Sequence, residues 1–188
     1  MTLLICGLLF FMIVHLSLGI APGIKDAIIN SVGVKTWRGI FSALALGALL
    51  IIVLGWRSAP VEYAYVPPYW LRHVTMLLML VAFILFGAAK GSTNIQRVIR
   101  HPMLTAVFIW SIAHLLANGE TRSLLLFGSF LVWIILQILL VNKREGEWIK
   151  PEPVPLKRTL RNMIISIVMY LVFFSLHKYY AGISLIPT

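Results

Sequence analysis

Six long apolar runs, separated by short polar segments, dominate the pattern of the chain. A helix that crosses the hydrocarbon core of a bilayer needs about 20 mostly apolar residues, and each run approaches that length. The pattern therefore predicts an all-α fold, an integral membrane bundle of six transmembrane helices that forms a single domain over residues 1–188. The predicted helices cover residues 2–20, 39–56, 74–89, 102–118, 123–141 and 162–180.

The segment after the first run has a helical pattern of its own. Ile24, Ala27, Ile28 and Val32 recur at the spacing of one helix face, with polar residues between them. This spacing indicates a short helix that lies in the membrane interface. A plain loop is the alternative, and the sequence leaves both open.

Small residues and prolines mark two other features of the chain. Gly39, Ala43 and Gly47 are spaced four apart in the second run, which predicts the close approach of another helix. Before the last run, three prolines stand at positions 151, 153 and 155. They predict an extended connection rather than a helix.

The composition agrees with a membrane location. Apolar residues make up 60% of the chain and charged residues 12%, whereas a soluble domain carries about 25% charged residues. The net charge is nevertheless +10. Because the basic residues flank the apolar runs and do not gather on one solvated face, the charge indicates topology and argues against nucleic-acid binding.

Basic residues are unequally divided between the two sides of the predicted bundle. Arg57, Arg72, Arg122 and Lys178 fall on one side, and the other twelve of the 16 lie in the loops after the first, third and fifth runs. The positive-inside rule places the richer loops in the cytoplasm, against anionic lipid, and both termini outside. The twelve are Lys25, Lys35, Arg38, Lys90, Arg97, Arg100, Lys143, Arg144, Lys150, Lys157, Arg158 and Arg161.

Little catalytic chemistry is available inside the runs. The single cysteine, Cys6, cannot form an intrachain disulfide or a Cys-x-x-Cys-His haem attachment. Away from the ends of the runs there is no Asp, Glu, Lys or Arg, which argues against a proton or ion transporter and against catalysis by paired carboxylates. Histidines are therefore the deep ionisable groups.

His15 and His114 lie at depth in the first and fourth runs. Such histidines can be structural, because an imidazole forms hydrogen bonds between helices. Two of them on separate helices also suit the axial ligands of a haem iron. Trp110, Ser111 and Asn118 share the helix face of His114 and suit a flat apolar cofactor beside an imidazole, with helix packing as the alternative.

Many of the remaining polar and aromatic residues fall in short motifs. These are Val14-His15, Ala21-Pro22-Gly23, Trp37-Arg38-Gly39, Trp70-Leu71-Arg72-His73, Arg100-His101-Pro102-Met103-Leu104, the stretch from Trp110 to Gly119, and Leu126-Phe127-Gly128. Together they resemble the NnrU family of bacterial membrane proteins over residues 1–142. The resemblance implies a multi-pass protein of the bacterial inner membrane, linked genetically to nitrite and nitric oxide reduction.

The same pattern resembles 15-cis-zeta-carotene isomerase, a membrane enzyme that uses haem b. By this resemblance, His15 and His114 are the two ligands of the haem iron. The isomerase carries a cysteine three residues before its second ligand, where this chain has Ser111. The resemblance therefore implies a redox- or gas-responsive haem protein, with isomerase-like activity on a small apolar substrate in doubt.

Three further expectations concern the charged residues. Arg72 and Arg100 are candidates to neutralise the haem propionates, on charge alone. Arg100-His101-Pro102 also resembles a motif of membrane methyltransferases and sterol reductases, which hold a nucleotide-derived cofactor at the cytoplasmic face; a plain helix start is the structural alternative. A cofactor-free accessory factor that meets a nitrogen-oxide reductase through its basic face is the third interpretation.

Overall fold

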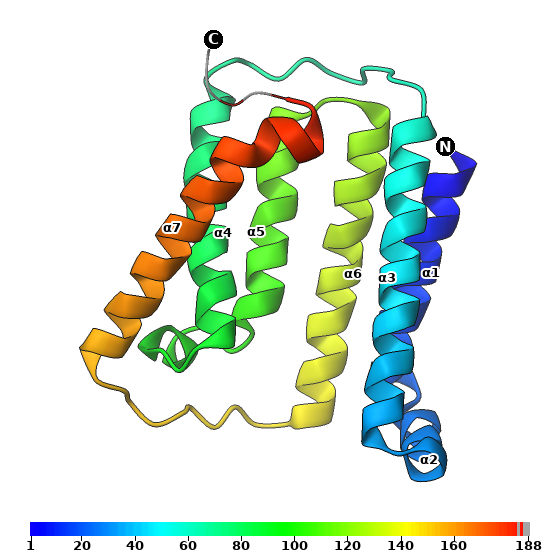
Figure 1. Ribbon diagram of the computed structural model, residues 1–188, viewed down its shortest axis with the longest axis vertical. Coiled ribbons are helices and arrows are strands. Elements are labelled where there is room, and N and C mark those ends of the chain that lie inside the picture. Colours follow the sequence, from blue (N-terminus) through cyan, green and yellow to red (C-terminus); the bar gives the residue numbers. More distant parts are fainter. Residues whose placement is uncertain (184, 186–188) are drawn as a thin grey trace. The chain divides into compact units, whose positions relative to one another are not determined.

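The computed structural model describes residues 1–183 and 185, and this part of the chain is helical with no β-strand. One isolated bridge joins Tyr63 and Glu120. The helices are α1 (Thr2–Ile20), α2 (Pro22–Val32), α3 (Val34–Ser58), α4 (Leu71–Lys90), the short 3-10 helix η1 (Asn94–Arg97), α5 (Pro102–Ala117), α6 (Thr121–Glu145) and α7 (Leu156–Ala181) (Figure 1). The predicted all-α class is confirmed.

Five of these helices, α1, α3, α4, α6 and α7, are long and apolar enough to cross a membrane. The protein is thus a multi-pass membrane protein by the length and composition of its helices. The fourth predicted span corresponds to α5, which is apolar but has only 16 residues. At 1.5 Å per residue, α5 is about 24 Å long, less than the roughly 30 Å of a hydrocarbon core.

Two helices begin well before their predicted starts. α3 starts at Val34, five residues before position 39, and α7 starts at Leu156, six residues before position 162. The predicted starts are wrong because hydropathy marks where a helix enters lipid, whereas backbone hydrogen bonds continue into polar turns. The extended connection predicted from the three prolines is confirmed. It covers residues 146–155, between the end of α6 and the start of α7.

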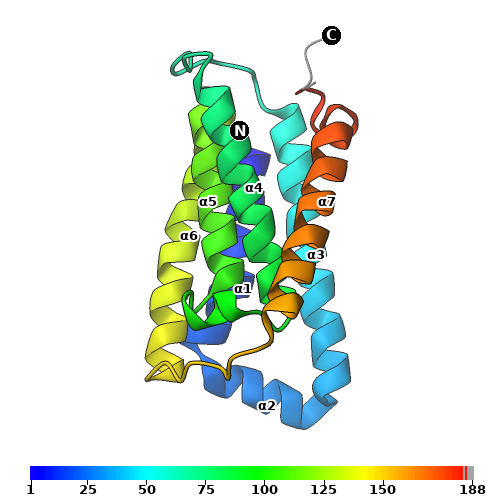
Figure 2. The same ribbon diagram turned by 90° about the vertical axis from the view of Figure 1, so that its left-hand side faces the viewer.

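The short helix after the first run is present as α2, so the plain loop is wrong. Pro22 occupies the first turn, where its missing N–H costs no hydrogen bond. At the other end Gly33 adopts φ +82°, a conformation that favours glycine and that allows a sharp turn into α3. Figure 2 shows α2 running across the ends of α1 and α3.

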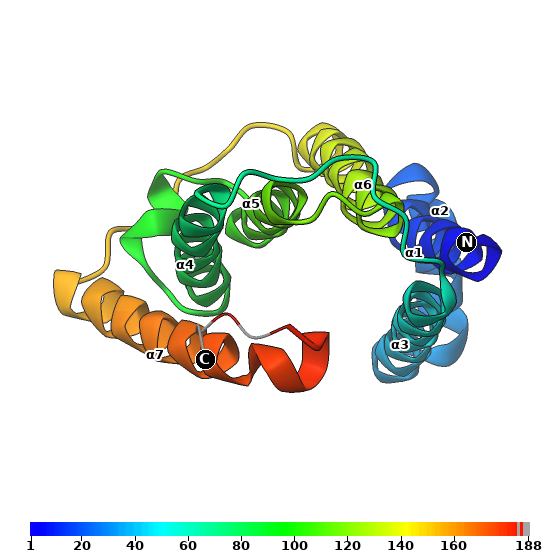
Figure 3. The same ribbon diagram turned by 90° about the horizontal axis from the view of Figure 1, so that it is seen from above.

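The helices form two compact units, each built from two separate stretches of chain. The first unit comprises Met1–Pro68 and Asn118–Glu147, and the second comprises Tyr69–Ala117 and the chain from Trp148 onward. In the first unit α1 packs between α3 and α6, and in the second α4 packs between α5 and α7 (Figure 3). That the whole chain forms one domain stays a prediction.

Glycines set the closest helix approach in the first unit. A Cβ at Gly55 of α3 would collide with the backbone of Leu4, and one at Gly7 of α1 would lie 2.8 Å from the backbone nitrogen of Ile52. At Gly39 and Gly47, by contrast, an added Cβ meets nothing within 4 Å. The predicted packing stripe is therefore wrong within this unit, because α1 crosses α3 closer to its C-terminal end.

Interhelical hydrogen bonds tie the second unit together. Thr75 of α4 donates through Oγ1 to the carbonyl oxygen of Ala113 in α5, at 2.9 Å. Between α7 and α4, Tyr170 donates to the carbonyl oxygen of Met76 at 3.1 Å, and Asn162 donates to that of Gly87 at 3.0 Å. Such bonds satisfy polar groups that lipid could not.

Candidate functional site

His15 projects from α1 with one ring nitrogen already engaged. Its Nδ1 lies 2.9 Å from the carbonyl oxygen of Phe11, one helical turn earlier. A carbonyl oxygen only accepts hydrogen bonds, so Nδ1 carries the proton and Nε2 presents the lone pair. Nε2 is therefore the nitrogen that can bind a metal, in the arrangement common among metal-ligating histidines.

Aromatic rings from three helices of the first unit surround the imidazole of His15. The ring of Phe11 stacks on it, with centroids 3.9 Å apart and planes at 24°. Phe41 of α3 and Trp133 of α6 approach edge-on, with centroids at 5.3 Å and 5.4 Å. The half-buried imidazole is thereby held in one orientation within an apolar aromatic cluster.

Two polar atoms of α6 are buried without a hydrogen-bond partner among the described residues. They are Nε1 of Trp133, in the aromatic cluster of His15, and Oε1 of Gln137. These residues are four apart, so they share one face of α6. Buried polar groups are rarely left unpaired. Sequence reasoning missed both residues, although Gln137 is the one amide side chain of the run 123–141.

His114 of α5 repeats the geometry of His15 in the second unit. Its Nδ1 lies 2.8 Å from the carbonyl oxygen of Trp110, so Nε2 is again the unprotonated nitrogen. The ring of Trp110 lies 5.0 Å from the imidazole, at 51°. Thr75 anchors the neighbouring Ala113 to α4. The structure thus brings His114 and Trp110 together, as the sequence predicted.

Ser111 and Asn118 have different places in the structure. Ser111 is fully buried, and its hydroxyl donates to the carbonyl oxygen of Val107 at 2.9 Å. Its hydroxyl is thus bonded within its own helix. Because α5 ends at Ala117, the helical spacing that placed Asn118 on the face of His114 does not reach that residue. That Ser111 and Asn118 contact a bound cofactor stays a prediction.

Arg72 and Arg100 lie at opposite ends of the second unit. The Thr75–Ala113 bond joins the start of α4 to the end of α5, and His114 is three residues from that end. Arg72, at the start of α4 with its guanidinium 5.1 Å from the Tyr69 ring, is therefore at the His114 end. Arg100 precedes α5 at the other end, so the two cannot both serve one pair of propionates.

The remaining histidines have separate surroundings. His73 is exposed on α4, and His177 of α7 has Nδ1 2.8 Å from the carbonyl oxygen of Ile183. His101 and Arg100 line a cavity of about 350 Å³ in the second unit, together with Gln96 and Trp148. Pro102 begins α5, which confirms the helix start expected of the Arg100-His101-Pro102 motif.

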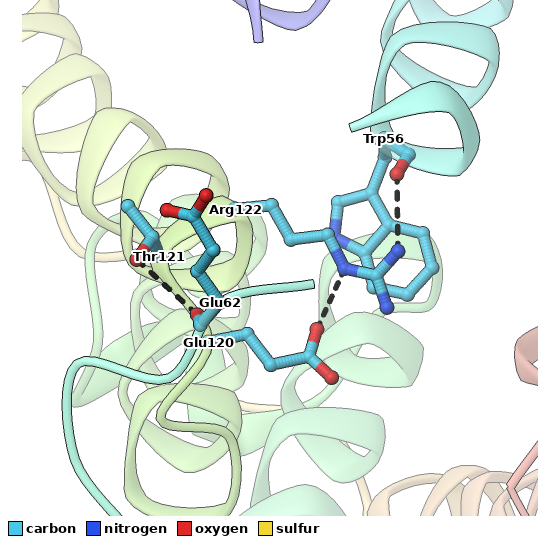
Figure 4. Close-up of polar contacts among 5 residues, drawn as sticks. All are labelled: Trp56, Glu62, Glu120, Thr121 and Arg122. Atoms are coloured by element: carbon cyan, nitrogen blue, oxygen red, sulfur yellow. Dashed lines mark hydrogen bonds and ion pairs between the residues drawn. The ribbon is translucent and has the colours of Figure 1, made fainter. Parts of the chain in front are cut away.

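A partly buried ion pair lies at one end of the first unit (Figure 4). Arg122 donates through Nε to Glu120 Oε2 at 2.7 Å and through a terminal nitrogen to the carbonyl oxygen of Trp56 at 3.3 Å. Its guanidinium lies 3.8 Å from the centre of the Trp56 ring. Beside it, Thr121 donates its backbone N–H to the Glu62 carbonyl oxygen at 2.8 Å. Sequence reasoning had treated Arg122 only as a basic loop residue.

The loop before α4 is fastened to the same turn. The backbone N–H of Ala64 donates to the Gly119 carbonyl oxygen at 2.8 Å, and the Tyr65 hydroxyl donates to that of Asn118 at 3.2 Å. A Cβ at Gly119 would collide with the carbonyl oxygen of Tyr65. Desolvation raises the pKa of the Tyr65 phenol, which keeps it a donor.

Comparison with known proteins decides the family. The model of the family described as "NnrU protein" matches residues 3–185. The chain belongs to the NnrU family. The match extends past the expected 142 residues and includes α7 of this NnrU protein. Searches among curated proteins and among solved structures gave no match.

The described residues of the NnrU protein contain no group of three or more His, Cys, Asp or Glu side chains placed to hold a metal ion. A haem iron needs fewer protein ligands, because the porphyrin supplies four nitrogens and the protein only the axial positions. His15 and His114, each with Nδ1 fixed on a carbonyl, have the donor chemistry for those positions. Trp133 Nε1 beside His15 is a buried donor suited to an acceptor on a bound group.

Proposed function

We propose that the protein binds one haem b, with His15 and His114 as the axial ligands. The observation that carries this proposal is the repeated geometry of the two imidazoles, each of which donates from Nδ1 to a carbonyl oxygen four residues earlier. Both Nε2 atoms are thereby left unprotonated and oriented by their own helices.

The surroundings of the two histidines support the same proposal. The Phe11, Phe41 and Trp133 rings give His15 an apolar environment, and Trp110 does so for His114. Such rings exclude water and keep the imidazoles neutral. Arg72, at the His114 end of its unit, is the better candidate for a propionate partner than Arg100.

Bound haem would supply a redox-active iron that takes small gaseous ligands. We therefore assign to the protein a redox- or gas-responsive role in nitrite and nitric oxide metabolism, in keeping with its family. Isomerase-like activity is less well supported, because the residue three positions before His114 is Ser111, whose hydroxyl is bonded to Val107. A serine hydroxyl is a harder ligand than a thiolate, so Ser111 cannot take the place of the cysteine sulfur as a ligand of the haem iron.

The absorption spectrum of the purified protein tests this function. After expression with adequate haem supply and purification in mild detergent, we expect a Soret band and a pyridine haemochrome spectrum of haem b, because two neutral imidazoles are available. The control is the same preparation of a His15→Ala, His114→Ala double variant, which is expected to lack the band. A wild-type protein without a Soret band would overturn the proposal.

The topology is part of the proposal. We place α5 as a sixth span in the bacterial inner membrane, with both termini outside, on the support of its apolar sequence and of the twelve basic residues on one side. A local thinning of the bilayer would accommodate its 16 residues. Alkaline phosphatase fused after Gly119 is then expected to be active and the fusion after Gly146 inactive. The reverse pattern, or equal activities, would contradict this topology.

A second candidate function has one observation in its favour. The cavity of about 350 Å³ at Arg100 and His101 is large enough for part of a nucleotide-derived cofactor, as in the methyltransferase-like interpretation. S-adenosylmethionine, titrated calorimetrically into the purified protein, tests it. Binding that is lost in His101→Ala and kept in His73→Ala would favour this candidate, whereas absence of binding to the wild type would remove it.

A further inference from the structure

A second, larger cavity lies where α4 ends and α7 begins. Its volume is about 560 Å³. Lys157, Arg158 and Arg161 of α7 line it on one side, and Gly91 and Ser92 line it on the other. None of the three basic side chains makes a hydrogen bond or ion pair with the described residues, and no carboxylate is among the residues that line the cavity. The cavity is therefore cationic without a counter-charge.

The N-terminal end of α7 makes this excess of positive charge unfavourable as long as no anion is bound there. The helix has 26 residues, no acidic residue in its first turn and no side chain that caps it. The N-terminal end of a helix carries a partial positive charge and unpaired N–H groups, which favour an anion and disfavour Lys157 and Arg158. A bound anion would offset both the basic side chains and the helix end.

The cavity walls are fixed to one another. Asn94, in η1, donates from Nδ2 to the carbonyl oxygen of Val154 at 2.8 Å and accepts from the N–H of Val154 at 2.9 Å. Its own N–H donates to Thr159 Oγ1 at 3.1 Å. Figure 1 shows η1 beside the start of α7. These bonds hold the α4–η1 segment against α7, so the cavity is part of the fold and not a passing gap.

A glycine and an amide define the inner end of the cavity. A Cβ at Gly91 would lie 2.7 Å from Nδ2 of Asn162, so a larger residue would displace that side chain. The amide donates to the carbonyl oxygen of Gly87, while its Oδ1 is buried without a donor among the described residues. Oδ1 lies on the side of Gly87, shielded from solvent, so the amide closes the inner wall and the basic side chains are the polar groups open to a ligand.

Beyond the cavity, α7 presents apolar side chains to its surroundings. Ile164, Ile165 and Val168 are exposed, between 52% and 62% of their surface, and Ile165 also lines the cavity. In a membrane such a surface faces acyl chains. The cationic cavity thus opens directly beside a lipid-facing stripe of the same helix.

We propose that this cavity binds a phosphate group, specifically the phosphodiester of an anionic phospholipid. Arg158, Arg161 and the first N–H groups of α7 would receive the phosphate, and the acyl chains would follow the exposed face of α7. Free phosphate shares the chemistry of the headgroup, so the test separates the two sources.

The test uses the full-length protein in neutral detergent and reads bound lipid by native mass spectrometry during titration with phosphatidylglycerol. The test variant is Arg158→Gln, Arg161→Gln. The matched control is Lys35→Gln, Arg38→Gln, which removes two exposed cations from the first turns of α3 that line neither of the two cavities described above. Loss of about 1 kcal/mol for each basic residue corresponds to a roughly 25-fold weaker affinity in the test variant, and the control is expected to bind as the wild type does.

Further results separate free phosphate from phospholipid, and an anionic headgroup from a neutral one. Displacement of phosphatidylglycerol by inorganic phosphate would keep the site and assign it to free phosphate, whereas retention of the lipid assigns it to the ester. Phosphatidylcholine, whose headgroup has no net charge, is expected to bind more weakly. Equal affinities in the wild type and the test variant, equal losses in both double variants, or equal binding of the two lipids would overturn the proposal.

Discussion

Replacing Arg122 with glutamine is expected to lower the free energy of unfolding by about 2 kcal/mol, because it leaves a partly buried carboxylate without its charged hydrogen-bond partner. The side chains of Arg122 and Glu120 are only 12% and 15% exposed. The substitution also removes the guanidinium from the Trp56 ring and from the Trp56 carbonyl oxygen. Unfolding in mixed micelles of mild detergent and sodium dodecyl sulfate measures the loss.

Two further variants show whether the loss belongs to the ion pair. Arg57→Gln removes an exposed cation next to Trp56 and is expected to change stability by less than about 0.5 kcal/mol. The double variant Glu120→Gln, Arg122→Met removes both charges and is expected to recover much of the stability. If Arg122→Gln destabilises the protein no more than Arg57→Gln does, the Arg122–Glu120 ion pair does not stabilise this end of the first unit.

Replacing either His15 or His114 with alanine is expected to weaken haem binding by more than about 100-fold, since changes to groups that merely support a metal ligand already cost 10- to 100-fold. Titration of the apoprotein with haem, followed by difference absorbance, measures the affinity. His73→Ala is the matched control because His73 is exposed on α4. A variant of either candidate ligand that binds haem as tightly as His73→Ala does would exclude that residue as a ligand.

The helices were largely predictable, because an apolar run must be helical to cross lipid. α1 agrees with the predicted 2–20 at both ends, since its polar flanks are short. The starts of α3 and α7 were not predictable from hydropathy, because their first turns carry Lys35 and Lys157 outside the apolar region. Which surfaces of the helices pack together was harder still to predict. α1 approaches α3 closely at Gly7 and Gly55, and not at the regularly spaced Gly39 and Gly47.

The candidate site was predictable only in its residue types. The scarcity of other ionisable groups at depth singled out His15 and His114, but no spacing indicates which ring nitrogen carries the proton. That depends on the Phe11 and Trp110 carbonyl oxygens, and so on side-chain rotamers. Trp133 was likewise beyond sequence reasoning, because its place beside His15 follows from the packing of α6 against α1.

Electron paramagnetic resonance of the oxidised, haem-loaded protein reports the axial ligands most directly. We predict a low-spin ferric signal with two imidazole ligands for the wild type and for His73→Ala. In His15→Ala and in His114→Ala, loaded with excess haem, this signal is expected to give way to a high-spin signal, because one axial nitrogen is lost. A wild type without a ferric haem signal, or a low-spin signal that persists unchanged in both variants, would contradict haem ligation by these two histidines.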